Sequence, residues 1–269
     1  MKKNVQHNSN SLKTFYLYAT VVFVLIIISL TVKAIFILQQ SRVDPAHEFI
    51  LAVIQQRHVK EIVAFHPETP TLSILLIQDS AVSYDMLAKI YGITTDGYIE
   101  TNGEPQGADL TAFLWQSLLH TGTGESNLTI LDKIRLMLLA KNVVTNNKTS
   151  QQLFLTKQTS DTNTMISTAL TDQELASENI SIEVVNATGV SGLGQRLGKV
   201  LTNLGANVVD VTSAAKEQPR TTLAYFGDES YTTDRLQKFL GISASKLSKQ
   251  TIADIIITIG NDKKGTKAF

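Results

Sequence analysis

A run of glycines and small polar side chains stands where an alternating strand passes into an amphipathic helix. The strand is ISIEVVN (180–186), and the helix lies in LGQRLGKVLTNLG (193–205), where apolar residues recur every three or four positions. A helix that starts in a glycine-containing loop offers free backbone N–H groups, which can hold one anionic group. The sequence therefore predicts a ligand-binding loop that consists of Asn186, Thr188, Gly189, Ser191, Gly192 and Arg196.

The same residues have a second, purely structural interpretation. Thr188 or Ser191 caps the helix, and the glycines only permit a tight turn. The glycine order G-x-x-G-x-G matches neither the dinucleotide-binding fingerprint nor the phosphate-binding loop of nucleotide hydrolases, and no Lys-Ser or Lys-Thr pair follows it. Both interpretations stay open at this point, and neither requires a cofactor.

Few other side chains are placed to do chemistry. The chain has no cysteine, so disulfides, thiolate metal sites and a cysteine nucleophile are excluded. The histidines beyond the first apolar segment lack the spacing of metal ligands, and the acids of the middle segment lack a D-x-D pattern. These residues are His47, His58, His66, His120, Asp79, Asp85 and Asp96. We therefore expect no catalytic residue, no metal site and no cofactor.

The charge pattern excludes one class of partner. Lys+Arg and Asp+Glu are both 24, so the formal net charge is zero, and acidic residues outnumber basic ones between residues 39 and 179. Binding to a phosphate backbone needs a concentrated basic face. Nucleic acid is therefore not an expected partner. The hydrophobic content of 43% also excludes a chain that is disordered as a whole.

An uncharged apolar run follows the N-terminus. FYLYATVVFVLIIISLTV (15–32) carries no charge, and the apolar run continues after Lys33 to Leu38. Since about 20 helical residues cross about 30 Å of hydrocarbon, we expect residues 15–38 to be a transmembrane helix. A cleaved signal peptide is the alternative, although its apolar core is typically shorter. Three lysines precede the span, which places residues 1–14 in the cytoplasm and residues 39–269 outside.

Residues 39–144 have the pattern of a small mixed α/β domain. Apolar, β-branched runs predict strands at 49–55, 61–65 and 71–78, and Pro67 and Pro70 turn the last two into a hairpin. A further strand is expected at 95–100, and helices at 83–91 with Gly92 as the stop, at 108–120 with Asp109 as N-cap, and at 132–143. Thr, Ser, Gln and Asn dominate residues 145–179, which predicts a partly extended linker, with 153–155 adding a strand to the domain before it.

Residues 180–269 predict a second domain. Strands at 207–211, 222–226 and 253–260 and a helix at 231–241 follow the first strand and helix, which gives the order β-α-β-β-α-β. This order is typical of a ferredoxin-like split βαβ sandwich. The basic tail is expected to be solvated, with Lys263, Lys264 and Lys267 able to touch an anionic wall polymer. The expected fold class is α/β (α+β), with a transmembrane helix ahead of two domains.

Two parts of the chain resemble known families. FHPETPTLSILLIQDSA (65–81) and IYGITTDGYIETN (90–102) resemble the LytR-CpsA-Psr domain, whose members transfer lipid-linked anionic glycopolymers to bacterial peptidoglycan. Gln78 stands where that family has an arginine and only Asp79 of the motif remains, so the resemblance implies a degenerate form. VVNATGVSGLG (184–194) and ADIIITIGND (253–262) resemble the LytR C-terminal domain, an accessory unit of bacterial envelope proteins.

These observations predict a single-pass bacterial membrane protein that binds cell-wall polymer or envelope proteins without catalysis, in an accessory role in glycopolymer attachment. The alternative is an active LytR-CpsA-Psr-type phosphotransferase. Such an enzyme needs cations gathered against the transferring phosphates, whereas the cations of residues 39–144 are scattered along the sequence. Transcriptional control is not expected, because residues 1–14 are too short for a DNA-reading element.

Overall fold

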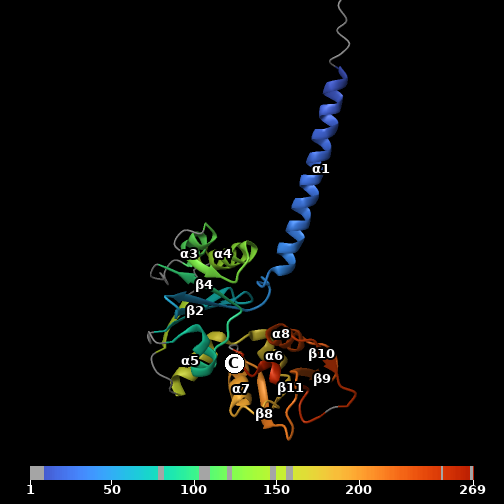
Figure 1. Cartoon of the computed structure of the whole chain (residues 1–269). Helices are drawn as coiled ribbons and strands as arrows, with labels where there is room; N and C mark the ends of the chain where they lie inside the picture. Colours follow the sequence, from blue (N-terminus) through green and yellow to red (C-terminus); the bar gives the residue numbers. More distant parts are fainter. Residues whose placement is uncertain are drawn as a thin grey trace, which may run out of the picture. The chain divides into compact units, whose positions relative to one another are not determined.

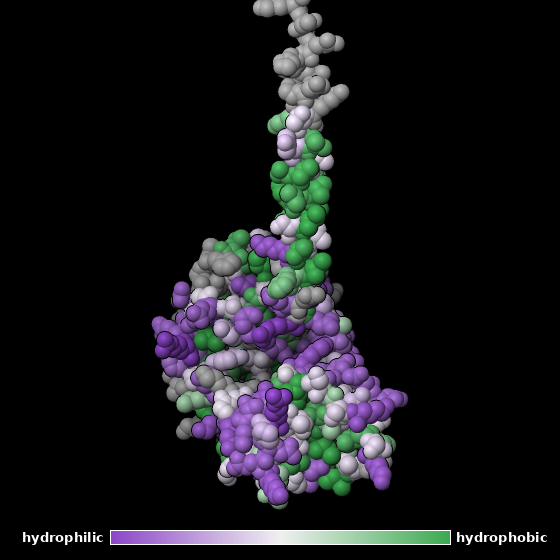
Figure 2. Space-filling model, turned by 45° about the vertical axis from the view of Figure 1, so that its right-hand side comes forward, coloured by the Kyte–Doolittle hydropathy of each residue, from purple (hydrophilic) through white to green (hydrophobic). Residues whose placement is uncertain are grey.

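Two units make up the computed structural model of the chain, residues 1–41 and residues 42–269. It describes residues 9–77, 82–102, 110–119, 123–145, 150–155, 160–249, 251–266 and 269. In the first unit, α1 (Ser9–Gln40) is a single helix of 32 residues. Its residues Thr14–Lys33 are long and apolar enough to cross a membrane, and Figure 2 shows the apolar side chains along it. The span expected at residues 15–38 therefore lies within one helix.

The second unit contains a six-stranded mixed sheet, here called sheet A, with the strand order β5-β4-β1-β2-β3-β6. Strand β2 is antiparallel to both of its neighbours, β1 and β3, while β4 runs parallel to β1 and β6 parallel to β3. The bounds are β1 (Phe49–Gln55), β2 (His58–His66), β3 (Thr71–Ile77), β4 (Gly97–Thr101), β5 (Thr123–Ser126) and β6 (Ser150–Leu155). The strands and the hairpin expected from the apolar runs are confirmed, and β5 is an additional strand.

Helices cover both faces of sheet A (Figure 1). On one face, Leu51 and Val63 pack against Leu114 and Leu136. On the other face, Ile62 belongs to a larger core that continues into the C-terminal part of the chain. The first face carries α3 (Leu110–Leu118) and α4 (Ile130–Thr145), and the core of the second face contains α2 (Leu87–Tyr91) and α5 (Ser160–Leu170).

Local signals in the sequence set the helix ends of this region. Gly92 ends α2 with φ 67, in the left-handed conformation that glycine adopts without strain, as predicted. A 3₁₀ turn, Tyr84–Met86, precedes α2 and accounts for the first residues of the helix expected at 83–91. The helix expected at 132–143 begins at Ile130. Asp109, the expected N-cap of α3, lies outside the described residues.

The segment expected to be an extended linker contains two helices. Residues 160–178 include α5 and α6 (Gln173–Glu178), while the strand expected at 153–155 is part of β6. The prediction of an extended chain is wrong here because Ile166, Ala169 and Leu170 share one helix face and are buried. Polar residues outnumber apolar ones in this Thr- and Ser-rich segment, so its overall composition hides the narrow apolar face.

Residues 181–259 form a second mixed sheet, here called sheet B, with the strand order β10-β9-β11-β7-β8. Strand β7 is parallel to both β8 and β11, and β11 is antiparallel to β9. The mixed α/β fold class is therefore confirmed. The bounds are β7 (Ser181–Asn186), α7 (Leu193–Asn203), β8 (Asn207–Ser213), β9 (Thr222–Tyr225), α8 (Tyr231–Leu240), β10 (Ala244–Lys246) and β11 (Ile255–Ile259).

The strand order of sheet B differs from that of a ferredoxin-like sandwich. In a split βαβ unit, another strand separates the two parallel strands, but β7 and β8 are hydrogen-bonded neighbours. The expected order β-α-β-β-α-β is present along the chain, with β10 added between α8 and β11. The order of elements along the chain does not determine whether β8, which follows α7, pairs directly with β7 or lies one strand away from it. It therefore could not distinguish the observed sheet from a ferredoxin-like one.

The C-terminal tail packs onto the domain, and the expectation of a solvated end is wrong. Phe269 is 2% exposed and its ring lies 6.5 Å from that of Phe239, because an apolar terminal ring gains from burial. Lys263 Nζ donates to the carbonyl of Leu240 at 2.8 Å. Lys264 forms an ion pair with Glu217, and Lys267 lies outside the described residues.

Asp132 fixes the start of the second unit to α4. Its Oδ1 accepts the backbone N–H groups of Arg42 (2.9 Å) and Val43 (3.0 Å), and its Oδ2 accepts the N–H of Thr129 (2.8 Å). The Thr129 hydroxyl in turn accepts the N–H of Asp132 at 3.1 Å, which completes a capping box. Arg135 adds a bond to the carbonyl of Val43 at 2.6 Å. One buried carboxylate thus begins α4 and holds the chain that follows α1.

Glu178, the last residue of α6, holds the start of α8. Its carboxylate accepts the N–H of Tyr231 (3.0 Å) and both the N–H (2.7 Å) and hydroxyl (2.6 Å) of Thr232. Ser230 caps the next free N–H, that of Thr233. Partial burial alone would raise the pKa of Glu178, but these hydrogen bonds hold it below its ordinary value.

Replacing Asp132 by alanine is expected to lower the free energy of unfolding by about 3 kcal/mol, since it removes a helix cap and strands the N–H groups of Arg42 and Val43. Urea unfolding of the full chain in detergent, followed by circular dichroism, measures the change. Asp228→Ala is the control, because the Asp228 side chain is fully exposed. Equal stability of the two variants would show that the Asp132 contacts contribute nothing.

Glu178→Gln is expected to lower stability by about 1–2 kcal/mol at pH 7, because the charged acceptor of two helix N–H groups is lost. A folded-state pKa below the unfolded value gives stability that is present above about pH 4.5 and is lost as the pH falls through the folded pKa. The difference between wild type and variant should therefore shrink as urea unfolding is repeated below pH 4.5. Glu229→Gln, at an exposed position before the same helix, should change stability by less than about 0.5 kcal/mol at either pH.

Candidate functional site

The residues of the predicted binding loop lie together between β7 and α7. Asn186 ends β7 and is almost buried. Its Oδ1 accepts hydrogen bonds from the N–H (3.2 Å) and the hydroxyl (2.7 Å) of Thr188, and its Nδ2 donates to the carbonyl of Val190 (2.8 Å). Both polar atoms of the amide are therefore used inside the loop. Asn186 shapes the loop.

The glycines provide backbone conformations that the turn requires. Gly189 has φ 68 and Gly192 has φ 78, values that other residues adopt only with strain. Gly192 is the N-cap of α7, with no side-chain hydrogen bond to the helix start. The expectation that Thr188 or Ser191 caps α7 is therefore wrong: the Thr188 hydroxyl accepts the N–H of Val190 at 3.1 Å instead.

A carboxylate stands beside the glycine turn. A Cβ atom at Gly189 would clash with Oε1 of Glu217. Oε2 of Glu217 accepts hydrogen bonds from Lys264 Nζ and Asn261 Nδ2, both at 3.1 Å. These bonds hold the pKa of Glu217 below its ordinary value, and the bond from Lys264 has the larger effect. An anion that approached Gly189 would meet this negative charge. The exposed Ser191 and the partly exposed Arg196, on the α7 side of the loop, are the remaining polar groups of the predicted set.

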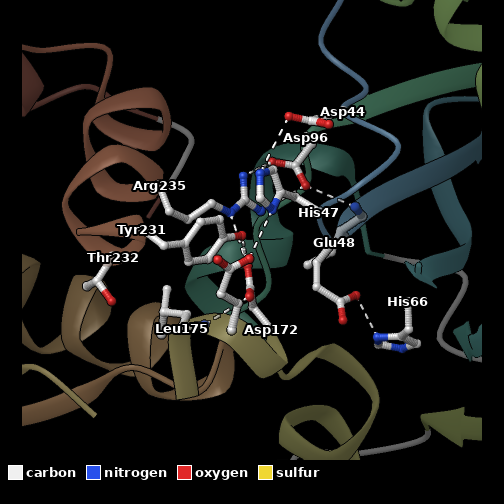
Figure 3. Close-up of polar contacts among 12 residues, drawn as sticks. Asp44, His47, Glu48, His66, Asp96, Asp172, Leu175, Tyr231, Thr232 and Arg235 are labelled. Atoms are coloured by element: carbon white, nitrogen blue, oxygen red, sulfur yellow. Dashed lines mark hydrogen bonds and ion pairs between the residues drawn. The ribbon is translucent and has the colours of Figure 1, made fainter. Parts of the chain in front are cut away.

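A cluster of charged side chains that sequence reasoning missed lies between sheet A and α8 (Figure 3). The Arg235 guanidinium donates to both carboxylate oxygens of Asp96, at 2.9 and 3.1 Å, and its Nε lies 3.4 Å from Asp172 Oδ2. Asp172 also accepts the Tyr231 hydroxyl at 2.7 Å and caps α6. Asp96 further accepts the N–H of Ile50 at 2.9 Å. No spacing pattern could reveal a pair of residues 139 positions apart.

Electrostatics keep Arg235 charged and Tyr231 neutral. Burial alone would lower the pKa of Arg235, but the Asp96 carboxylate, by its charge and its hydrogen bonds, raises it. Burial raises the pKa of Tyr231, and its hydrogen bond to Asp172 raises it further. Asp96 is thus part of an ion-pair network. The network has a structural role, because each of its charged side chains is paired with another side chain of the network.

A second buried network contains a serine, a histidine and a glutamate. His66 Nδ1 lies 2.6 Å from Glu48 Oε2, and its Nε2 lies 3.0 Å from Ser73 Oγ. Burial raises the pKa of Glu48, and the bond to His66 partly offsets this. The order of groups is that of a nucleophile, its base and an orienting acid. A neighbouring cavity of about 320 Å³ is lined by His66, Phe65, Leu139 and others, but not by Ser73, which is buried within β3.

This second network therefore has no accessible nucleophile, and we assign it to the interior of the fold. His66 is the last residue of β2, directly before the turn at residues 67–70. His47 pairs separately with Glu174 at 3.1 Å and Asp44 at 3.5 Å. Within the described parts of the chain, no three His, Asp or Glu side chains gather as metal ligands.

Replacing Arg235 by methionine is expected to lower the free energy of unfolding by about 3–5 kcal/mol, because Asp96 and Asp172 are left as unpaired charges. Adding Asp96→Asn to this variant should recover at least about 1 kcal/mol, since one stranded charge is removed. Urea unfolding measures both steps, with Lys238→Met, exposed on the same helix, as the control. Strictly additive losses would contradict a direct pairing of Arg235 with Asp96.

Comparison with known proteins matches one part of the chain. Residues 179–262 match the LytR_C family, described as LytR cell envelope-related transcriptional attenuator. No curated protein and no solved structure matches the chain. The matched residues run from the start of β7 through β11 to the short helix at Asn261–Lys263, so they coincide with sheet B and its helices. Residues 179–262 of this chain are a LytR C-terminal domain.

Proposed function

We propose that this protein is a single-pass membrane protein of the bacterial cell envelope that acts by binding, in an accessory role in cell-wall or glycopolymer attachment. The observation that carries the proposal is the LytR C-terminal domain at residues 179–262, which occurs in a chain that also has an apolar helix of membrane-spanning length. Cell-wall polymer, or another protein of the envelope, is the proposed partner.

The charge distribution supports an orientation with the N-terminus in the cytoplasm. Lys2, Lys3 and Lys13 precede the apolar part of α1, and positive charges next to a span favour the cytoplasmic side. Residues 42–269 would then face the envelope. This orientation puts the LytR C-terminal domain where wall polymer is accessible.

Two cations of α4 support binding over phosphoryl transfer. Lys133 Nζ donates to the carbonyl of Ser117 at 3.1 Å, and Arg135 donates to the carbonyl of Val43. Burial lowers the pKa of Lys133. These cations are used in packing α4, whereas a phosphotransferase needs cations aimed at a substrate. Gln78 and Asp79, the remnant of the transferase motif, lie outside the described residues.

The β7–α7 loop provides a specific test of where an anionic polymer would bind. Arg196 adds a positive charge beside the start of α7, and Glu217 adds a negative charge beside Gly189. If this loop contacts the polymer, the two side chains must act in opposite directions, because one attracts and the other repels an anion.

We expect the full chain in mild detergent to cosediment with bacterial sacculi at low salt, and to lose this binding when the anionic glycopolymer is stripped or the salt is raised. Arg196→Gln should weaken binding about threefold or more and Glu217→Gln should strengthen it, each by the Coulomb term of one exposed charge. Lys238→Gln, which removes an exposed charge from α8, is the control.

Two results would contradict parts of the proposal. If all three variants bind equally, the polymer does not contact the β7–α7 loop. If the wild type binds neither intact nor stripped sacculi, the polymer is not the ligand, and a protein partner in the membrane takes its place. Turnover of a polyprenyl-pyrophosphate glycan by the chain, lost in Asp79→Ala or Arg57→Ala, would replace binding by transferase activity.

A further inference from the structure

The outer faces of α3 and α4 expose large apolar side chains. Trp115 lies near the end of α3 and Leu119 directly follows that helix, while Ile130 and Leu138 lie two turns apart on α4. They are 48%, 55%, 57% and 52% exposed. The opposite faces of both helices bury Leu114 and other residues against sheet A. The exposed residues therefore point away from the sheet, as an outward apolar layer here called the α3–α4 face.

The composition of α3 is unusual for a helix with a free outer surface. LTAFLWQSL carries no charged residue, whereas the exposed side of a surface helix is ordinarily charged or polar. Tryptophan in particular is favoured at the boundary between lipid and water, where its ring is buried and its N–H stays hydrated. The composition of α3 thus indicates that its outer surface contacts an apolar environment and not water alone.

The chain itself brings this face close to a membrane, if α1 spans one. The apolar run of α1 ends at Leu38, and Arg42 and Val43 are already held at the first turn of α4 by Asp132. Arg42 comes four positions after Leu38, and four extended residues reach at most about 14 Å. Arg42, which is bonded to Asp132 in the first turn of α4, can therefore lie no more than about 14 Å from Leu38.

We propose that the α3–α4 face rests on the outer surface of the same membrane that α1 crosses, with Trp115 and its apolar neighbours among the lipid headgroups. The inference rests on the proposed membrane anchoring and adds a second contact to it. Sheet A separates the α3–α4 face from α5 and the LytR C-terminal domain (Figure 1). Lipid contact at this face therefore directs the LytR C-terminal domain away from the membrane, toward the cell wall.

Trp115 is the only tryptophan of the chain, so its fluorescence reports on the α3–α4 face without a label. The full chain is reconstituted into phosphatidylcholine–phosphatidylglycerol vesicles whose acyl chains are brominated close to the headgroup. We expect the emission of Trp115 to fall to about half or less of its value in unbrominated vesicles, because bromine quenches a ring at the interface. Quenching by acrylamide from the water should fall as well.

Two variants serve as controls. Trp115→Phe combined with Phe226→Trp moves the single tryptophan to an exposed position after β9, in the LytR C-terminal domain, where brominated lipid should leave its emission unchanged. Ile130→Glu with Leu138→Glu places charges on the α3–α4 face at exposed positions, so the fold is retained, and the quenching of Trp115 by lipid should be lost. Circular dichroism confirms that each variant is folded.

The outcomes separate this inference from the proposed anchoring. If the chain stays in the vesicles after carbonate extraction but Trp115 is not quenched by brominated lipid, the lipid contact is wrong and the anchoring stands. If carbonate releases the chain, both are wrong. If Trp115 is shielded from acrylamide only at high protein-to-lipid ratios and is not quenched by lipid, a second copy of the chain covers the face, which also overturns the proposal.

Discussion

The second face of sheet A must be covered, and the way it is covered makes residues 42–269 one body. Ala52 and Ile62 of this face are buried in the same core as Ile166 of α5 and Leu197 of α7. An apolar sheet face cannot remain in water, because burying it is the main favourable term in folding. Here α5, which also packs against α7, covers it. The helix that completes the middle segment therefore also attaches the LytR C-terminal domain.

Polar contacts give this apolar junction a defined geometry. Hydrophobic burial is not directional, so alone it would permit α7 to slide over the middle segment. The Asn203 side chain of α7 donates to the carbonyls of Tyr91 (3.1 Å) and Gly92 (2.8 Å), which stand at the C-terminal end of α2. Arg235 forms a bidentate ion pair with Asp96. Paired donors of this kind fit one arrangement only.

The parts of the fold that depend on neighbouring residues could be predicted from the sequence, and those that depend on distant residues could not. Gly92 marks a helix end by its own backbone freedom, and the β7–α7 turn is evident from its glycines. Helix α5 was not predicted because its sequence neighbours alone do not favour a helix. Its buried residue Ile166 is stabilised by packing in the core against sheet A, and sheet A comes from a distant part of the sequence. The same holds for the candidate site: Asn186 is satisfied by Thr188, two residues away, whereas the Glu217 carboxylate beside Gly189 comes from another loop.

If the chain is anchored in a membrane as proposed, a folded junction changes what its LytR C-terminal domain can do. An extended linker across residues 145–179 would let the domain search a wide volume, but each binding event would then cost the entropy of ordering the linker. The folded α5 and α6 remove that cost before any ligand arrives. The domain is instead held in a fixed position relative to sheet A. Under the proposed function, such a junction suits a partner in a layered envelope better than a partner that must be captured from solution.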